Sequence, residues 1–250
     1  MRSSRGSGNK WPSVSSETVD FVVPVFNEGE NIAAMLARLY GSVTLPKRVL
    51  IVYDFEQDDT LPVVRSLQDT HEGLTLVRNT RGAGVLNAIR SGIDAATGDV
   101  VIITMADLSD DPSVASEMVG RIRSGEADVV CASRYMRGGE QIGGPLIKRT
   151  LSRLAGLSLH YAGFPVHDAT NAFRAYRRDV LKSLEIESRG GFEYSLELTA
   201  KAYAAGFRVT EVPTRWRDRS AGQSRFRLLQ WLPRYLRWYW YALTHRPAGT

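Results

Sequence analysis

Short apolar runs that alternate with helical patterns constrain the fold of this chain more than any other feature. Four runs rich in β-branched residues predict buried strands, and they lie at residues 19–25, 48–53, 99–105 and 128–132. Apolar residues at helical spacing predict helices at residues 30–40, 60–68, 85–96 and 112–122. The alternation therefore predicts an α/β fold, with a mostly parallel sheet, helices on both faces and ligands outside the carboxyl ends of the strands.

The second half of the chain departs from this simple alternation. A glycine-rich stretch at residues 138–144 precedes a helical pattern at residues 146–161. After a polar turn, the pattern predicts a strand, a helix and a further strand, at residues 172–176, 192–205 and 208–216. We expect this half to form the far side of the ligand crevice.

Composition limits the domain organisation and the class of partner. The 250 residues, 43% of them hydrophobic, suffice for one core, so we expect a single domain. Residues 1–17 predict a disordered tail with no signal peptide, before a folded domain at 18–225 and a C-terminal tail at 226–250. These features, with a lone Cys131 that has no disulfide partner, indicate a cytoplasmic protein. A formal charge of +5 favours nucleic acid, anionic lipid headgroups or phosphorylated substrates as partners.

Polar residues follow the predicted strands at equivalent ends. They lie at residues 24–28, 54–59 and 107–111, and we expect them to converge on one crevice. Asp107 ends an apolar run, and a carboxylate in that place can hold Mg²⁺ against a diphosphate. We expect Asp110 or Asp111 to cap the helix that follows Pro112.

Three further features offer candidate site residues with open alternatives. Lys148 and Ser152 are four residues apart and share one face of a helix, which is either a binding surface or a solvated basic face. Asp168 follows His167 and is either a general base or a turn-stabilising acid. Glu28 is either a ligand-binding residue or an acid favoured by the dipole of the next helix.

Six segments together resemble glycosyltransferase family 2, and within it the dolichol-phosphate mannose synthase type. In chain order they are residues 23–28, 54–60, 106–109, 132–135, 173–176 and 218–225. The resemblance spans roughly residues 19–226, and its weight comes from the order and spacing of the segments. It implies a GT-A type (Rossmann-like) fold and an inverting glycosyltransferase. The implied reaction moves a sugar from a nucleotide-sugar donor to a phosphorylated or polyprenyl-phosphate (lipid-linked) acceptor.

The resemblance also implies roles for individual residues. Those implied to bind the nucleotide sugar are Pro24, Phe26, Glu28, Asp54, Ala106 and Asp107. Asp107 and Ser109 are implied ligands of Mg²⁺ or Mn²⁺, and Arg134, Lys148 and Ser152 are implied to hold the acceptor phosphate. The catalytic candidates are Asp107, Asp168, Arg219 and Arg225. The two arginines lie in a loop that resembles the family's diphosphate-closing segment, where guanidinium groups would neutralise departing charge.

Two positions depart from the pattern of the family. Met105 replaces the first acid of the Asp-X-Asp metal motif, and Tyr53 replaces the first acid after the second strand. Because a thioether is a poor ligand for a hard cation, we expect metal binding to depend on Asp107, the diphosphate and water. Asp58 and Asp59 either compensate for part of the lost charge or are solvated loop acids, and we expect the second. Because of these departures, an inactive homologue that only binds a nucleotide sugar is one alternative function. A glycosyltransferase that acts on a soluble hydroxyl acceptor or a polysaccharide is the other.

The C-terminal segment predicts an amphipathic helix. Leucine and tyrosine residues recur at helical spacing between residues 228 and 243, with arginine and tryptophan residues beside them. This composition is typical of a helix in a membrane interface, and the run is too short and too interrupted to span a bilayer. We therefore expect a peripheral protein at the inner face of the membrane, with no nucleic-acid partner. Packing of the helix onto the domain, or onto a second copy in a homodimer, is the alternative.

Overall fold

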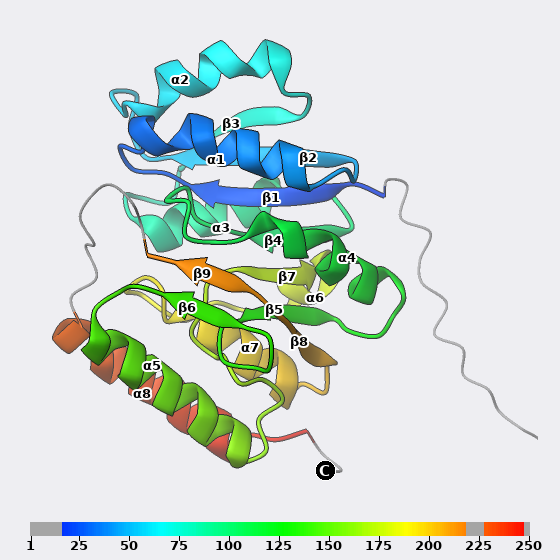
Figure 1. The fold of residues 1–250 in the computed structure, drawn as a ribbon, viewed down its shortest axis with the longest axis vertical. Helices are drawn as coiled ribbons and strands as arrows, with labels where there is room; N and C mark the ends of the chain where they lie inside the picture. Colours follow the sequence, from blue (N-terminus) through cyan, green and yellow to red (C-terminus); the bar gives the residue numbers. More distant parts are fainter. Residues whose placement is uncertain (1–16, 219–227, 248–250) are drawn as a thin grey trace, which may run out of the picture.

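The computed structural model describes residues 17–218 and 228–247, and its first half contains the predicted elements (Figure 1). The four predicted strands are β1 (Val19–Pro24), β2 (Lys47–Tyr53), β4 (Val100–Ile103) and β5 (Val129–Ser133). The helices between them are α1 (Gly29–Ser42), α2 (Thr60–Leu67), α3 (Val85–Ala95) and α4 (Ala115–Arg123). Residues 1–16, where the sequence predicts a disordered tail, lie outside the described residues.

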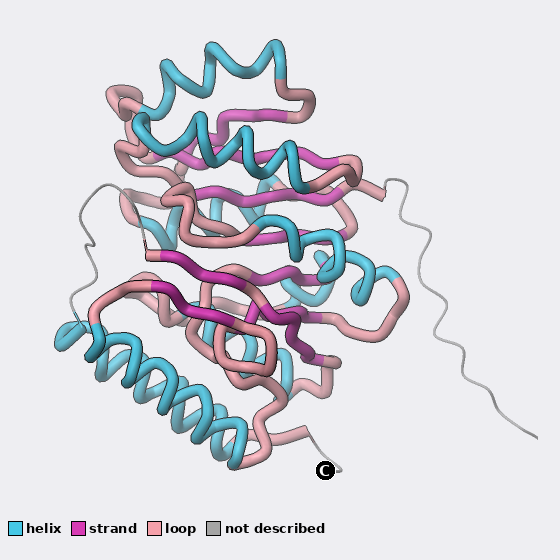
Figure 2. The backbone as a smooth tube through the Cα atoms, in the orientation of Figure 1, coloured by secondary structure: helices cyan, strands magenta, loops and turns pink. Residues whose placement is uncertain are grey.

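Seven strands form the central sheet in the order β3-β2-β1-β4-β7-β5-β8. The three strands not yet given are β3 (Leu74–Arg78), β7 (Arg174–Arg177) and β8 (Val209–Pro213). Within this sheet only β7 is antiparallel to its neighbours, β4 and β5, and every other neighbouring pair is parallel. Figure 2 shows the sheet between its helices, so the predicted mostly parallel α/β architecture is confirmed.

The two faces of the sheet carry separate hydrophobic cores. Alternate residues of β1 divide between them, since Phe21 and Val23 face one core and Val22 faces the other. Helices α1, α2 and α4 cover the first core. The second core is covered by α3, α5 (Leu146–Tyr161), α6 (Arg178–Ser183), α7 (Tyr194–Ala204) and α8 (Leu228–Thr244). Burial on both faces explains why these strands read as continuous apolar runs.

The second half is less regular than the sequence indicates. The strand expected at residues 208–216 is divided at Thr214, and its second part is β9 (Arg215–Arg217). β9 pairs in parallel with β6 (Glu140–Ile142), outside the central sheet. The backbone N–H of Arg217 donates to the carbonyl oxygen of Ser109 at 3.0 Å. This bond joins β9 to the turn that follows β4.

The C-terminal helix α8 packs on the body of the protein through one face. Trp238 and Ala242 are buried at 2% and 3% exposure, whereas Leu232 and Leu236 of the predicted apolar stripe are exposed. Figure 1 shows α8 running beside α5. Among the described residues, no helix has the length and apolar character needed to cross a membrane.

Candidate active site

The carboxyl ends of β1, β2 and β4 lie at one edge of the sheet. In the strand register Pro24 pairs with Val52 and Val22 pairs with Ile103, so the three strands end together. The polar segments that follow them therefore lie at the same edge, as the sequence predicts.

The loop after β1 is held by carboxylates of the loop after β2. Asn27 has a φ of 53°, and its N–H donates to both oxygens of Asp58 at 3.1 Å. Asp58 also accepts from the N–H of Thr60 and is 1% exposed, so its description as a solvated acid is wrong. Asp59 accepts from the N–H of Gly29 at 2.8 Å. Asp58 and Asp59 therefore fix the backbone of this loop. The Glu28 carboxylate accepts a hydrogen bond from the side-chain amide of Asn31, in the first turn of α1.

Phe26 and Asp54 occupy different settings at this edge. The Phe26 ring is 42% exposed and meets the ring of Phe55 edge-on at 5.3 Å between centroids. The Asp54 carboxylate accepts from the Asn79 side chain at 2.7 Å and from the N–H of Gly84 at 2.8 Å. Asp54 thus ties the end of β2 to the loop before α3.

The turn after β4 brings two predicted metal ligands together. The N–H of Ser109 donates to Oδ1 of Asp107 at 3.1 Å, across a Leu108 residue with a φ of 62°. A bulky residue in this left-handed region stores about 1–3 kcal/mol of strain, which the surrounding contacts must hold. Asp107 and Ser109 are 8% and 4% exposed, and Oγ of Ser109 has no partner among the described residues. Ala106 is buried beside them.

Asp110 and Asp111 have different roles, and the sequence did not separate them. Asp111 caps the short 3₁₀ turn at Pro112–Val114, where its side chain accepts from the N–H of Ser113 at 3.1 Å. Oδ2 of Asp110 instead accepts from Oγ1 of Thr104 at 2.9 Å and from the N–H of Met105 at 3.4 Å. Burial, and then the negative charge of Asp107, raises the pKa of Asp110 to about 7. Asp110 is a site residue that sequence reasoning missed, because the capping pattern before Pro112 explained it equally well.

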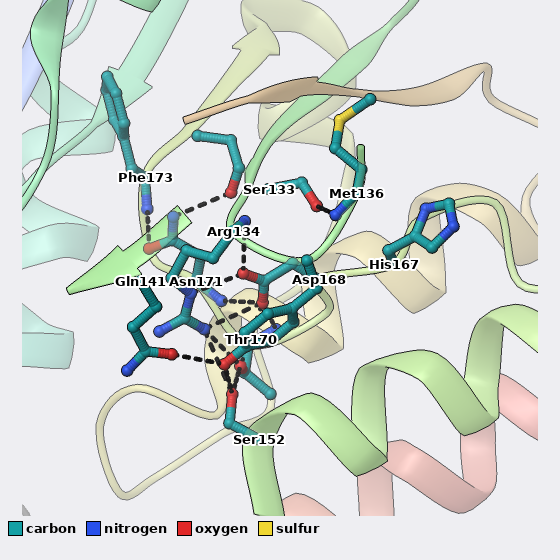
Figure 3. Close-up of polar contacts among 12 residues, drawn as sticks. Ser133, Arg134, Met136, Gln141, Ser152, His167, Asp168, Thr170, Asn171 and Phe173 are labelled. Atoms are coloured by element: carbon teal, nitrogen blue, oxygen red, sulfur yellow. Dashed lines mark hydrogen bonds and ion pairs between the residues drawn. The ribbon is translucent and has the colours of Figure 1, made fainter. Parts of the chain in front are cut away.

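Arg134 is the centre of a polar cluster on the other side of the site (Figure 3). Its guanidinium donates to the Asp168 carboxylate from Nε at 2.7 Å and from Nη2 at 3.0 Å. Nη2 also donates to the hydroxyl groups of Ser152 and Thr170, at 3.3 and 2.9 Å. The hydroxyl of Tyr135 donates to the same oxygen of Ser152 at 2.8 Å. Burial disfavours the charged form of the Arg134 guanidinium, but the adjacent Asp168 raises the pKa of Arg134 above its ordinary value.

The geometry contradicts the prediction of Asp168 as a catalytic base. Its side chain is 0% exposed and accepts from the backbone N–H groups of Arg134, Thr170 and Asn171, besides the guanidinium. Burial alone would raise the pKa of Asp168, but the charge and hydrogen bonds of Arg134 lower it. A fully bonded carboxylate beneath an arginine has no place for a substrate proton, so Asp168 positions Arg134.

His167, the neighbour of Asp168 in the sequence, pairs with a different carboxylate. Its Nδ1 pairs with a carboxylate oxygen of Glu211, and its ring stacks on His160 at 3.6 Å between centroids. Figure 3 shows His167 pointing away from the cluster around Asp168. His160 also bonds to the carbonyl oxygen of Phe164 through its Nδ1.

A cavity of about 460 Å³ joins the Asp107 turn to the Arg134 cluster. Its lining includes Asp107, Ser109, Asp110, Arg134, Lys148, Arg149 and Ser152. The lining also includes the apolar residues Leu151, Phe192 and Leu232. The predicted donor residues Pro24, Phe26, Glu28, Asp54 and Ala106 are not part of this lining. Arg219 and Arg225 lie outside the described residues.

The residues at the Asp107 turn suit a hard divalent cation only in part. Across residues 17–218 and 228–247, no group of three or more His, Cys, Asp or Glu side chains is arranged to hold a metal ion. The oxygen atoms of Asp107, Asp110 and Ser109 are the type of ligand that Mg²⁺ and Mn²⁺ prefer. A cation at this turn would need further oxygen ligands from a diphosphate and water.

The mostly parallel sheet, with this site outside the carboxyl ends of its strands, defines a GT-A type fold, and comparison with known proteins identifies the family. Residues 20–185 match the model of glycosyl transferase family 2, so the chain belongs to that family. It is 31% identical to the polyprenol monophosphomannose synthase of Mycolicibacterium smegmatis, over 82% of this chain and 79% of the relative. It is 26% identical to the dolichol-phosphate mannosyltransferase of Pyrococcus furiosus, over 88% of this chain, and spans 64% of that relative's length.

Solved structures share the fold at lower identity. Glucosyl-3-phosphoglycerate synthase from Mycobacterium tuberculosis, in complex with Mn²⁺, UDP and glucosyl-3-phosphoglycerate, matches with a TM-score of 0.70. That match has 18% identity and covers 94% of this chain and 83% of the other. A mannosyltransferase from Pyrobaculum calidifontis, in complex with GDP-Man and Mn²⁺, matches with a TM-score of 0.61 at 21% identity, over 88% of this chain and 62% of the other. The predicted GT-A fold is confirmed.

Proposed function

We propose that this chain transfers a sugar, with inversion, from a nucleotide-sugar donor to the phosphate of a polyprenyl phosphate at the cytoplasmic face of a membrane. One observation carries the proposal. A single cavity has oxygen ligands at Asp107, basic side chains at Arg134 and Lys148, and apolar residues of α5 and α8. These three environments match a diphosphate with its cation, a second phosphate and a lipid chain.

The donor is assigned to the edge formed by β1, β2 and β4. We assign Pro24, Phe26, Glu28 and Asp54 to the base and ribose, because the exposed Phe26 ring gives a base an apolar surface. Ala106 and Asp107 then face the sugar diphosphate. The two relatives named above as mannose-transferring proteins favour mannose as the sugar.

Asp107 and Ser109 would hold Mg²⁺ or Mn²⁺, as sequence reasoning proposes. The buried Ser109 hydroxyl, which has no partner among the described residues, supports this assignment. When bound, the cation supplies positive charge that stabilises the departing diphosphate. We assign the same task to Arg219 and Arg225 on the sequence alone.

The acceptor phosphate is assigned to Arg134, Lys148 and Ser152. Asp168 and Thr170 fix the guanidinium of Arg134, so a phosphate would meet a preorganised donor. A phosphate acceptor is already an anion and requires no general base, which agrees with the engagement of Asp168 by Arg134. A hydroxyl acceptor would require such a base.

The reaction is tested by offering GDP-mannose and UDP-glucose with a short-chain polyprenyl phosphate and Mn²⁺. We expect labelled sugar to enter the organic phase, from GDP-mannose above all. Transfer only to a soluble hydroxyl acceptor would contradict the proposal and support the alternative acceptor class. Loss of labelled sugar from the donor, even without acceptor, excludes an inactive homologue.

Helices α5 and α8 are assigned to the membrane surface. Ten large hydrophobic side chains are exposed in the described residues, and five lie on α5 and three on α8. Those on α5 are Leu146, Ile147, Leu151, Leu154 and Tyr161, and those on α8 are Leu232, Leu236 and Trp240. Arg149 and Arg153 lie among the α5 residues, and their positive charge attracts anionic headgroups to this surface.

Vesicle binding tests this surface without disturbing the buried face of α8. The double substitution Leu154→Ser with Leu236→Ser should reduce co-sedimentation with anionic vesicles severalfold, and added salt should weaken binding of the unmodified chain. Ile142→Ser is the control, because Ile142 is exposed at 37% but lies on neither helix. Equal recovery of all three proteins would contradict the assignment. A homodimer formed through this face would instead appear as a change of mass in sedimentation equilibrium.

A further inference from the structure

The turn after β4 contains an acid that the metal motif does not predict. In the family pattern a carboxylate would stand at position 105, where this chain has Met105. The N–H of Met105 donates to Oδ2 of Asp110, five residues further on, and so brings a carboxylate against the same backbone position. The hydroxyl group of Thr104 donates to the same oxygen at 2.9 Å.

The positive charge of Arg134 acts on Asp110, but that arginine is hydrogen-bonded to Asp168. Asp110 is 8% exposed, and none of the described residues forms an ion pair with it. Both of its hydrogen bonds end on Oδ2, so Oδ1 accepts no hydrogen bond from the described residues. Buried carboxylates are usually paired with a cation or coordinate a metal.

A second observation points to a ligand at the same turn. Oγ of Ser109 is buried, has no hydrogen-bond partner in the described part of the chain, and belongs to the lining of the cavity. Asp107, Ser109 and Asp110 therefore present two carboxylates and one unsatisfied hydroxyl to one space. Oxygen ligands in this number, completed by a diphosphate and water, fit the coordination of Mg²⁺ or Mn²⁺.

We propose that Asp110 takes the place of the acid lost at Met105 and supplies the second carboxylate for the divalent cation. The inference rests on the proposed use of a metal with a nucleotide donor and extends it to a new residue. The second acidic ligand is then supplied from position 110 instead of position 105, because the turn brings the Asp110 carboxylate against the N–H of Met105.

The test measures Mn²⁺ binding in the presence of GDP or UDP, by electron paramagnetic resonance of the free ion. Asp110→Asn should weaken Mn²⁺ binding at least about tenfold, since the loss of outer-shell partners alone costs 10–100-fold. Asp111→Asn is the matched control, because Asp111 is the adjacent acid and serves as a cap. The double variant Asp110→Asn with Met105→Asp should restore binding to within about threefold of the unmodified protein.

The possible results separate the role of Asp110 from the proposed function. Unchanged Mn²⁺ affinity in Asp110→Asn, with nucleotide binding intact, would overturn the role of Asp110 and leave the proposed function standing. Weaker binding without rescue by Met105→Asp, in a variant whose circular dichroism and melting temperature are unchanged, would overturn the replacement. An unmodified protein that binds neither nucleotide with Mn²⁺ would overturn the donor assignment as well.

Discussion

Asp110 and Asp168 are both buried carboxylates beside the same cavity, yet their surroundings are opposite. Asp168 accepts three backbone N–H groups and a bidentate arginine, and its pKa is lowered. Asp110 accepts one hydroxyl and one long backbone bond, and its pKa is raised. A carboxylate that accepts several hydrogen bonds and an ion pair from the protein stabilises the fold. A carboxylate with few protein donors is available to a ligand.

The comparison divides the site into an acidic side and a basic side with different organisation. On the acidic side the hydrogen bonds from Ser109 to Asp107 and from Thr104 to Asp110 join residues within six positions. On the basic side the Arg134–Asp168 pair joins residues 34 positions apart, and Thr170 and Ser152 complete it. Substitutions on the first side should change metal binding and turnover, and those on the second should change stability or acceptor affinity.

The largest effect is expected at Asp107. Asp107→Asn should lower turnover by about a thousandfold or more, equivalent to about 4 kcal/mol of lost transition-state stabilisation, because metal-assisted departure of the diphosphate depends on this acid. Metal-dependent donor binding should fall with it, while the melting temperature stays within a few degrees. Asp111→Asn is the control and should retain activity. Full turnover in Asp107→Asn would show that the acidic side takes no part in the reaction.

Removal of the charge of Asp168 should act on stability instead. Asp168→Asn leaves Arg134 buried without its counter-ion, so the free energy of unfolding in urea should fall by about 3–5 kcal/mol at pH 7. Since the pKa of Asp168 is lowered in the folded state, its stabilisation is complete above the ordinary aspartate pKa and is lost as pH falls below it. The difference between the two proteins should therefore shrink at about pH 3.

Asp94→Asn provides the control for that measurement. The Arg81–Asp94 pair has a comparable N···O distance of 2.6 Å, but its side chains are 50% and 57% exposed. Its removal should cost about 1 kcal/mol or less. An equally small cost for Asp168→Asn would show that the buried pair does not hold the basic side together.

A smaller effect is expected when the geometry of Arg134 changes and its charge is kept. Arg134→Lys loses the planar fork that bonds to Asp168, Thr170 and Ser152, so the KM for polyprenyl phosphate should rise about tenfold while kcat changes little. Arg153→Lys, on the exposed part of α5, should leave both constants unchanged. A fall in kcat with a constant KM would place Arg134 in the chemical step rather than in acceptor binding.

The sequence predicted the first half of the fold well and the second half less well. The strands 19–25 and 48–53 were recognisable because both of their faces are buried, whereas β3 was missed because it is an edge strand with partly exposed residues. The position of β7 between β4 and β5 was not predictable either, since it depends on a pairing between residues distant in sequence. In the candidate site, the sequence pointed to Asp107 and Arg134, but it gave Asp110 as one of two possible caps and left Asp168 as either a base or a turn-stabilising acid.

The sequence by itself determined the family, the α/β alternation and the acid at the end of β4, because these follow from local patterns of apolar and polar residues. Only the tertiary structure decided what each buried carboxylate does. The charge of a carboxylate is stabilised by the donors and cations around it, and for Asp168 the cation is Arg134, which meets it only in the folded chain. Asp110 has no ion-pair partner among the described residues, because folding places it beside Met105 and Asp107, and Arg134, whose charge acts on it, is bonded to Asp168.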